Sequence, residues 1–69
     1  MKGVVTRVFA DKGYLFVRGT DGVSRFVHAS WTNGMFDALL AGTQVEFTPG
    51  EGEKGPKAED IKLLEATRL

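Results

Sequence analysis

The sequence predicts a small all-β fold, either a barrel or a sandwich built from short strands. Three observations support this prediction. The chain has only 69 residues, which is the size of one small domain. Nine glycines divide it into short pieces and leave no room for a long helix before residue 56. The pieces between the glycines are rich in β-branched and aromatic residues, and turn signals separate them.

The first half of the chain predicts three strands joined by tight turns. The first strand is rich in Val and Thr, which favour extended backbone. A turn at Gly13, which can take a positive φ, leads to the second strand. A hairpin loop containing Asp21-Gly22 leads to the third. The predicted strands are residues 2–9, 14–18 and 24–28.

The second half predicts a longer connection followed by two more strands. Residues 29–43 form the connection, in which residues 36–40 could form a helical turn. Residues 44–48 alternate between apolar and polar side chains, which is typical of a strand. Residues 50–56 are rich in glycine and are expected to form a flexible loop.

The last segment allows two interpretations. Four apolar residues would lie along one face of a helix: Ala58, Ile61, Leu64 and Leu69. Alternatively, residues 59–63 alternate as a fifth strand with Ile61 and Leu63 inward. We favour the strand, because four strands without a closing partner would leave open sheet edges. The chain is then a single domain over residues 1–69, with a barrel at about 1–63 and a short tail at 64–69.

The charges are balanced overall and unevenly distributed along the chain. Nine basic and nine acidic residues give a net charge of zero, and this figure alone counts against a general nucleic-acid binder. Residues 1–31 nevertheless carry a net +3, and residues 32–69 carry a net −3. One face can therefore be basic while the chain is neutral, although ordinary scatter of surface charge gives the same numbers.

The composition excludes several classes of site. The chain has no cysteine, which excludes disulfides and cysteine-ligated metals, and its one histidine, His28, excludes a multi-histidine metal site. The sequence carries no signal of a catalytic triad or of a phosphate-binding glycine loop, so we expect neither an enzyme nor a cofactor. It also lacks an apolar run long enough for a membrane helix or a signal peptide, so we expect a cytoplasmic location.

Six of the seven aromatic residues lie between positions 9 and 36, and five of them fall in the positively charged residues 1–31. Because side chains alternate across a strand, Tyr14 and Phe16 share one face, and so do Phe26 and His28 on the next strand. Either these rings or the aliphatic residues between them can fill the barrel. An imidazole fits poorly in a dry core, so we place the aliphatic residues inside and expect the rings to form an exposed patch. The expected core consists of Val5, Leu15, Val17, Val27 and Val45.

An exposed aromatic patch beside Arg7 and Lys12 matches the physics of single-stranded nucleic-acid binding. Bases stack on such rings at about 1–3 kcal/mol each, and neighbouring cations contact the phosphates.

A series of motifs resembles the cold-shock domain family over residues 1 to about 63. Residues 12–17, Lys-Gly-Tyr-Leu-Phe-Val, resemble the first ribonucleoprotein-type motif of that family, and residues 26–30, Phe-Val-His-Ala-Ser, resemble the second. Residues 34–42 and 51–58 resemble two further stretches of it. The resemblance implies a five-stranded antiparallel OB-fold barrel that binds single-stranded DNA or RNA, as bacterial RNA chaperones and antiterminators do.

The chain departs from the family pattern at several positions. Arg7 stands where the family has a stacking ring, although a guanidinium plane can also stack on a base. Ala29 stands where the family has an aromatic residue, and Arg25 stands at an inward-facing aliphatic position. Phe9 and Trp31 are additional aromatics that could compensate, and Trp31 could either be exposed or cap the end of the barrel.

The resemblance and the aromatic–basic pattern together predict a set of nucleic-acid contacts and no catalytic or metal-binding residue. The expected partner is single-stranded RNA or DNA, bound by a monomer with little sequence preference and with no role for a membrane. The alternative is a protein-interaction module on the same scaffold, which zero net charge and the losses at Arg7 and Ala29 favour. The position of the cations discriminates between the two functions: cations that converge on the aromatic face favour nucleic-acid binding, and cations that lie elsewhere favour the protein-interaction module. The candidate contacts are Arg7, Lys12, Tyr14, Phe16, Phe26, His28, Phe36 and Lys54.

Overall fold

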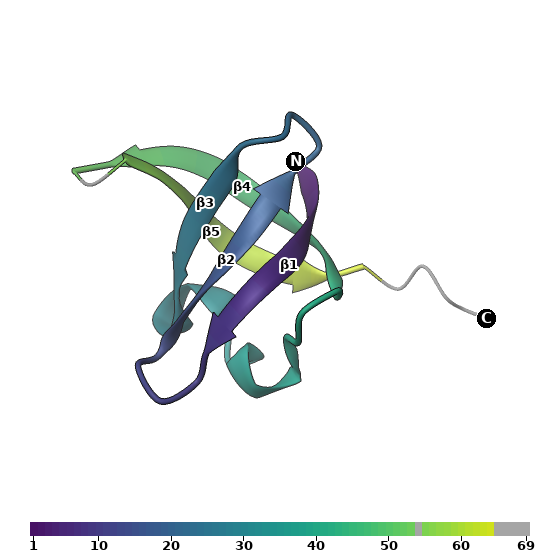
Figure 1. Ribbon diagram of the computed structural model, residues 1–69, viewed down its shortest axis with the longest axis vertical. Helices are drawn as coiled ribbons and strands as arrows, with labels where there is room; N and C mark the ends of the chain where they lie inside the picture. The colour runs from purple at the N-terminus through teal and green to yellow at the C-terminus, as the bar shows by residue number, and fades with distance from the viewer. Residues whose placement is uncertain (54, 65–69) are drawn as a thin grey trace.

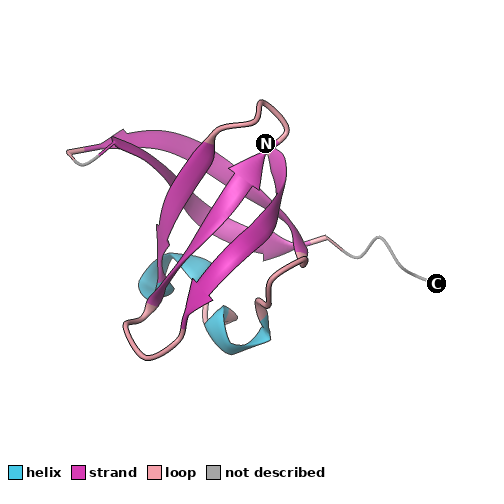
Figure 2. Cartoon of the chain, in the orientation of Figure 1, coloured by secondary structure: helices cyan, strands magenta, loops and turns pink. Residues whose placement is uncertain are grey.

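The strands form the wall of a small barrel, and two short 3₁₀ helices lie at one of its ends (Figures 1 and 2). The computed structural model describes residues 1–53 and 55–64. The three strands predicted in the first half are confirmed, the second extending one residue further than expected. The elements are β1 (Lys2–Phe9), β2 (Tyr14–Gly19), β3 (Ser24–His28), η1 (Ala29–Thr32), η2 (Phe36–Ala38), β4 (Gln44–Gly52) and β5 (Gly55–Leu63).

The five strands close into a barrel in the order β1-β2-β3-β5-β4. The predicted fifth strand is confirmed, and it closes the barrel between β3 and β4. The expectation of a purely antiparallel barrel needs one correction, because β3 and β5 run parallel and meet at the single pair Phe26–Lys57. All other pairs of neighbouring strands are antiparallel.

The aliphatic side chains fill the barrel, as predicted. Alternation along β2 buries Leu15 and Val17 completely, and the ring-bearing residues between them point outward. The predicted core is confirmed in full, and four further residues complete it. Nine buried hydrophobic residues form one cluster: Val5, Leu15, Val17, Val27, Leu39, Val45, Phe47, Ala58 and Ile61.

A β-bulge in β1 decides which side chains of that strand reach the surface. Val5 on β1 pairs with Val17 on β2. Arg7, two residues further along β1, pairs with Phe16, which is only one residue away from Val17 on β2. β1 therefore contains one extra residue, Thr6, at this point. Without this insertion, strict alternation would put Arg7 on the same face as the buried Val5. The Thr6 hydroxyl donates to the carbonyl of Phe16 at 3.3 Å, across the bulge. Arg7 is exposed as a result.

The β4–β5 connection is more regular than the sequence indicates. Residues 50–56 were expected to form a flexible loop, but the two strands continue pairing through Gly50–Lys57 and Glu51–Pro56 to Gly52–Gly55. This hairpin projects beyond the barrel in Figure 1. It has no hydrophobic alternation because it packs against no core, and so it lacks the pattern that predicts a strand.

Two expectations for the C-terminal region differ from the structure. Ile61 is buried as predicted, but Leu63 is 37% exposed rather than inward, because it is the last residue of β5 and lies at the end of the barrel wall. A second bulge, at Asp60 with φ 53°, explains how both Ala58 and Ile61 face the core although they are three residues apart. The predicted tail at 64–69 lies outside the described residues apart from Leu64.

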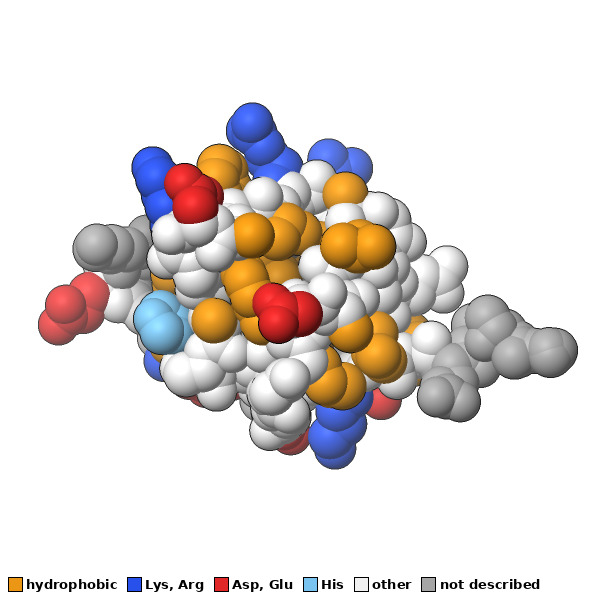
Figure 3. Space-filling model, turned by 90° about the horizontal axis from the view of Figure 1, so that it is seen from below, with side chains coloured by type: hydrophobic (Ala, Val, Ile, Leu, Met, Phe, Trp, Pro, Cys, Tyr) orange, Lys and Arg blue, Asp and Glu red, His pale blue; other side chains and the backbone are white. Residues whose placement is uncertain are grey.

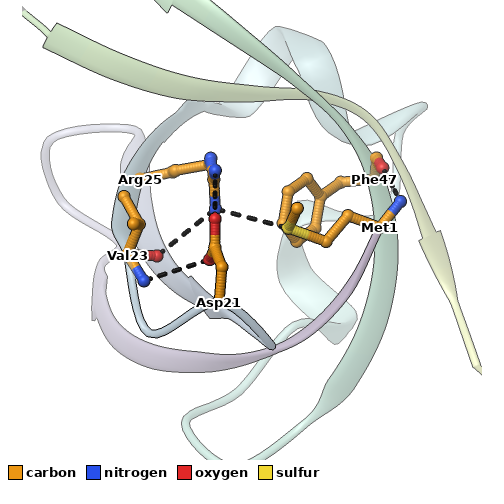
Figure 4. A network of polar contacts seen from close by, with 5 residues as sticks. All are labelled: Met1, Asp21, Val23, Arg25 and Phe47. Carbon is orange, nitrogen blue, oxygen red and sulfur yellow. Dashed lines mark hydrogen bonds and ion pairs between the residues drawn. The ribbon is translucent and has the colours of Figure 1, made fainter.

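A partly buried ion pair occupies the end of the barrel opposite the 3₁₀ helices (Figures 1 and 4). Arg25 points inward at the expected aliphatic position and is only 8% exposed. Its guanidinium forms two contacts with the carboxylate of Asp21, at 3.1 and 2.8 Å, and lies 5.5 Å from the centroid of Phe47. A Cβ on Gly19 would come within 2.7 Å of the guanidinium, so a larger residue there would require the Arg25 side chain to shift. The charged pair thus fills the end of the barrel where an aliphatic side chain was expected.

The ion pair makes stability depend on pH in the acid range. Hydrogen bonding to Arg25, and then to the backbone of Val23, lowers the pKa of Asp21 from 3.8 to about 2. A carboxylate with a lowered pKa stabilises the fold above its ordinary pKa, and this contribution is lost as the pH falls toward 2.

We therefore expect Asp21→Asn to reduce the free energy of unfolding at pH 7 and to have a progressively smaller effect between pH 4 and pH 2. Asparagine keeps the shape and can still accept from Val23, so the comparison isolates the charge. Urea unfolding of both proteins across this pH range measures the difference. An equal difference at pH 7 and pH 2 would contradict the role of the ion pair.

Candidate nucleic-acid interface

The outward-facing side chains of the barrel form two rows that run across the strands. The first row crosses four strands, in the order Arg7 on β1, Phe16 on β2, Phe26 on β3 and Lys57 on β5, each paired with the next. Neighbouring strands lie about 4.8 Å apart, so these side chains are direct neighbours. The row therefore has a cation at each end and two rings between them.

The second row lies two residues further along the strands, on the same outer face, and contains Phe9, Tyr14 and His28. The two rows interlock through ring contacts. The Tyr14 ring lies 4.9 Å from Phe9 and 5.3 Å from Phe26, and Phe16 lies 5.9 Å from Phe26 in an edge-to-face arrangement. We call this continuous surface the aromatic stripe: Phe9, Tyr14, Phe16, Phe26, His28 and Trp31.

The structure therefore brings together four of the predicted contacts, Tyr14, Phe16, Phe26 and His28, on one outer face. The three phenyl rings are half-buried by one another and by the strands beneath, and His28 is exposed. Rings held in this way lose little conformational freedom when a further flat group stacks on them.

His28 ends β3 and caps the 3₁₀ helix that follows. The backbone N–H of Ser30 donates to Nδ1 of the imidazole at 3.1 Å. Since Nδ1 accepts this bond, the neutral ring carries its proton on Nε2, which can act as a donor toward a ligand. The cap fixes the orientation of the ring at the edge of the stripe.

Trp31, whose position the sequence leaves open, completes the stripe. Its indole lies 5.8 Å from Phe26, edge to face, and 5.8 Å from His28. It is half-buried and also packs against the core, so it is partly exposed and partly a cap. Sequence reasoning identified Trp31 and Phe9 as extra aromatics but did not include them among the contacts. The signal that would have found Phe9 is the bulge, which the β1 sequence does not reveal.

A hydrogen-bonded link between η1 and β5 holds Trp31 in place. Asn33, at φ 55°, donates from its side-chain amide to the carboxylate of Asp60 and to the carbonyl of Ile61, both at 3.1 Å. Asn33 and Asp60, the two non-glycine residues with positive φ in the described part of the chain, thus bond to each other. The 3₁₀ turn that carries Trp31 is tied to the bulge of β5.

A cation lies at each end of the aromatic stripe. The Arg7 guanidinium lies 5.5 Å from the centroid of Phe9, and the Lys57 ammonium lies 5.4 Å from that of Trp31. Lys12 is exposed in the β1–β2 turn, two residues before Tyr14. Lys54, the other predicted cation, lies outside the described residues. Lys57 was not among the predicted contacts, because its place in a glycine-rich segment beside Glu51 and Glu53 is equally compatible with a solvated loop residue.

Phe36, predicted as a contact by family resemblance, lies in η2 and packs against the core. The ring–ring contacts of the described residues do not include it. Figure 3 views the end of the barrel that carries the two 3₁₀ helices, where hydrophobic side chains gather in the middle and the histidine lies at the margin. Phe36 thus extends the apolar surface near the stripe without belonging to it.

A groove of about 550 Å³ separates the stripe from the β4–β5 hairpin. Three rings line one side: Phe16, Phe26 and Trp31. Gly52, Gly55, Pro56 and the side chains of Glu53 and Lys57 line the other. A volume of this order holds a small flat ligand between apolar walls.

The described residues of the interface present side chains that can stack on a ligand, pair with its charges or donate hydrogen bonds to it. No group of three or more metal-ligating side chains occurs within residues 1–53 and 55–64. In that same part of the chain, every helix is too short or too polar to cross a membrane. What the interface offers a ligand is a set of π-faces, a few cations and the His28 donor.

Comparison with known proteins assigns the family. The family model described as the "'Cold-shock' DNA-binding domain" matches residues 1–64. The chain belongs to the cold-shock domain family. Among its relatives, a cold shock-like protein of Thermotoga maritima is 39% identical over 66 residues, covering 94% of this chain and 100% of the relative. Cold shock protein 1 of Lactiplantibacillus plantarum is 41% identical over 61 residues, covering 86% of this chain and 91% of the relative.

The fold, a five-stranded barrel of the OB type, is the one that the cold-shock resemblance implies, and the aromatic cluster lies on its surface. This cold-shock domain has Arg7 beside the Phe9 ring, and it has the small Ala29 immediately before Ser30. The aromatic stripe stays continuous because Trp31, two residues further on, contacts both Phe26 and His28.

We expect Asn33→Gly to loosen Trp31 while preserving the backbone, because glycine tolerates the positive φ but removes both hydrogen bonds to β5. Quenching of Trp31 fluorescence by acrylamide should increase, and the unfolding free energy should fall by about 0.5–1.5 kcal/mol for each hydrogen bond lost, the net contribution of an ordinary intramolecular hydrogen bond. Trp31 is the only tryptophan, so the signal is unambiguous. Unchanged quenching would show that the core contacts alone position the indole.

Proposed function

We propose that this cold-shock domain binds single-stranded RNA or DNA by stacking unpaired bases on the aromatic stripe, and that it keeps such strands unstructured in the manner of an RNA chaperone. The observation that carries the proposal is the row Arg7–Phe16–Phe26–Lys57, in which two rings lie between two cations on four adjacent strands. Bases can stack on the two rings while the backbone phosphates approach Arg7, and the stem of Lys57 borders the rings at the other end of the row.

Low sequence preference follows from the same arrangement. Every base presents a π-face, so stacking alone discriminates weakly among bases. Three of the six rings, Phe9, Phe16 and Phe26, offer only a π-face, and the other three add one polar donor each: the Tyr14 hydroxyl, the His28 Nε2–H and the Trp31 indole N–H. One copy of the chain carries the complete stripe, so the proposal needs no second copy and no catalytic step.

The residues that we propose as contacts differ slightly from those predicted from the sequence. Lys12 is retained as a phosphate contact, and Lys54 remains a prediction. Phe9, Trp31 and Lys57 are added because of their contacts within the stripe. The full set is Arg7, Phe9, Lys12, Tyr14, Phe16, Phe26, His28, Trp31, Lys54 and Lys57.

Titration with short oligo-T and oligo-U strands, followed by Trp31 fluorescence, tests the proposal. We expect saturable binding that weakens with salt, and Phe16→Ala should weaken it by about 1–3 kcal/mol, the contribution of one stacked base. Val23→Ala is a matched control, because Val23 is an exposed apolar side chain in the β2–β3 loop, outside the stripe.

Equal loss of affinity in Phe16→Ala and Val23→Ala would argue against stacking at Phe16. Absence of saturation at high micromolar strand and low salt would rule out the function. The second candidate, a protein-interaction module, is favoured by the small Ala29 and by the pairing of Lys57 with Glu59. It would then gain support from a partner that co-purifies after nuclease treatment.

A further inference from the structure

Lys57 occupies the position where three strands of the barrel meet. It pairs with Phe26 across the parallel β3–β5 contact and with Gly50 across the antiparallel β4–β5 ladder. Its ammonium lies 5.4 Å from the centroid of Trp31. Among the described cations beside the stripe, Lys57 is the one that lines the groove.

The aliphatic part of the Lys57 side chain packs beside two glycines of β4. A Cβ on Gly50 would lie 3.4 Å from Cε of Lys57, and a Cβ on Gly52 would lie 3.5 Å from its Cδ. Both distances are those of ordinary van der Waals contacts, so the lysine stem lies against β4 beside these two glycines. The side chain is only 29% exposed, which limits the directions in which the ammonium can point.

The carboxylate of Glu59 forms an ion pair with the Lys57 ammonium. The two residues lie on the same face of β5, and their charged groups are 3.1 Å apart. The other ion pair on this strand, between Asp60 and Lys62, is wider at 3.9 Å and its side chains are 65% and 55% exposed. The Lys57–Glu59 pair is the tighter and less solvated of the two, so its geometry costs less side-chain entropy to maintain.

We propose that the Lys57–Glu59 ion pair is an intramolecular lock that withholds Lys57 from the phosphates of a bound strand. To contact Lys57, a phosphate must compete with a carboxylate that is already in place and of the same sign. A nucleotide in the groove then stacks on Trp31 and Phe26 without a net phosphate attraction at the β5 end. The ionic part of binding is concentrated at the β1 end, at Arg7 and Lys12.

This inference rests on the proposed function and identifies Glu59 as a residue that limits affinity. Glu59→Gln should free Lys57 and strengthen oligo-T binding at low salt by about 1.5- to 5-fold, the range expected for one exposed ion pair. The dependence of log K on log salt should also steepen by about 0.7, the value for one additional phosphate contact on a single strand. Lys57→Met alone should change this slope by much less than 0.7.

The decisive measurement is a double-mutant cycle on oligo-T binding. Methionine keeps the packed stem of Lys57 without its charge, so Glu59→Gln in a Lys57→Met background should leave both affinity and salt slope unchanged. Glu46→Gln is the matched control, because it removes the same charge from β4 opposite Lys62, away from the groove lining, and should leave the salt slope unchanged. Thermal unfolding of each variant verifies that the barrel is intact.

The outcomes separate the lock from the proposed function. If the wild-type chain binds but Glu59→Gln has the same effect with and without Lys57, Glu59 acts only as a general negative charge and the lock is wrong. If the wild type binds and Glu59→Gln changes neither affinity nor slope, the lock is also wrong. If neither the wild type nor Glu59→Gln shows saturable binding, both the function and the lock are wrong.

Discussion

The interior of this barrel has room for one set of side chains, and that constraint determines the surface. Nine hydrophobic residues fill it, most of them aliphatic, and alternation along β2 and β3 then turns every intervening ring outward. The outward-facing rings pack edge to face on one another, and this packing covers part of the apolar surface that they would otherwise expose to water. A binding surface of preordered rings is therefore the direct counterpart of an aliphatic core.

Strict alternation would not by itself give this surface, and two bulges adjust it. The extra residue at Thr6 moves Arg7 and Phe9 to the outer face, where they join the two rows of the stripe. The extra residue at Asp60 lets both Ala58 and Ile61 face the core, and its carboxylate receives the Asn33 amide that ties down the turn carrying Trp31. Each end of the stripe is thus positioned by an irregularity in a strand and not by its regular part.

Period-two patterning predicted the strands of the first half, the inward aliphatic set and the shared face of Tyr14, Phe16, Phe26 and His28, because burial in β2 and β3 follows a simple alternation. It missed what depends on long-range pairing. The β4–β5 hairpin is held by ladder bonds with no core beneath it, the β3–β5 contact is parallel, and Lys57 reaches Trp31 only through that contact. Arg25 was recognised as inward-facing, but nothing local indicated that Asp21 would neutralise it.

The closed ladder has a consequence for how copies of this molecule meet in concentrated solution. A large exposed apolar face is ordinarily a hazard when a free strand edge lies beside it, because the edge templates intermolecular sheet and converts a transient contact into a fibre. In the described part of the chain all five strands have a neighbour on both sides. Most of the stripe lies on β1, β2 and β3, which pair with one another along most of their length, so a collision between two stripes brings mainly side chains into contact. The strand edges that stay free belong chiefly to the projecting part of the β4–β5 hairpin, beyond the Gly50–Lys57 pair.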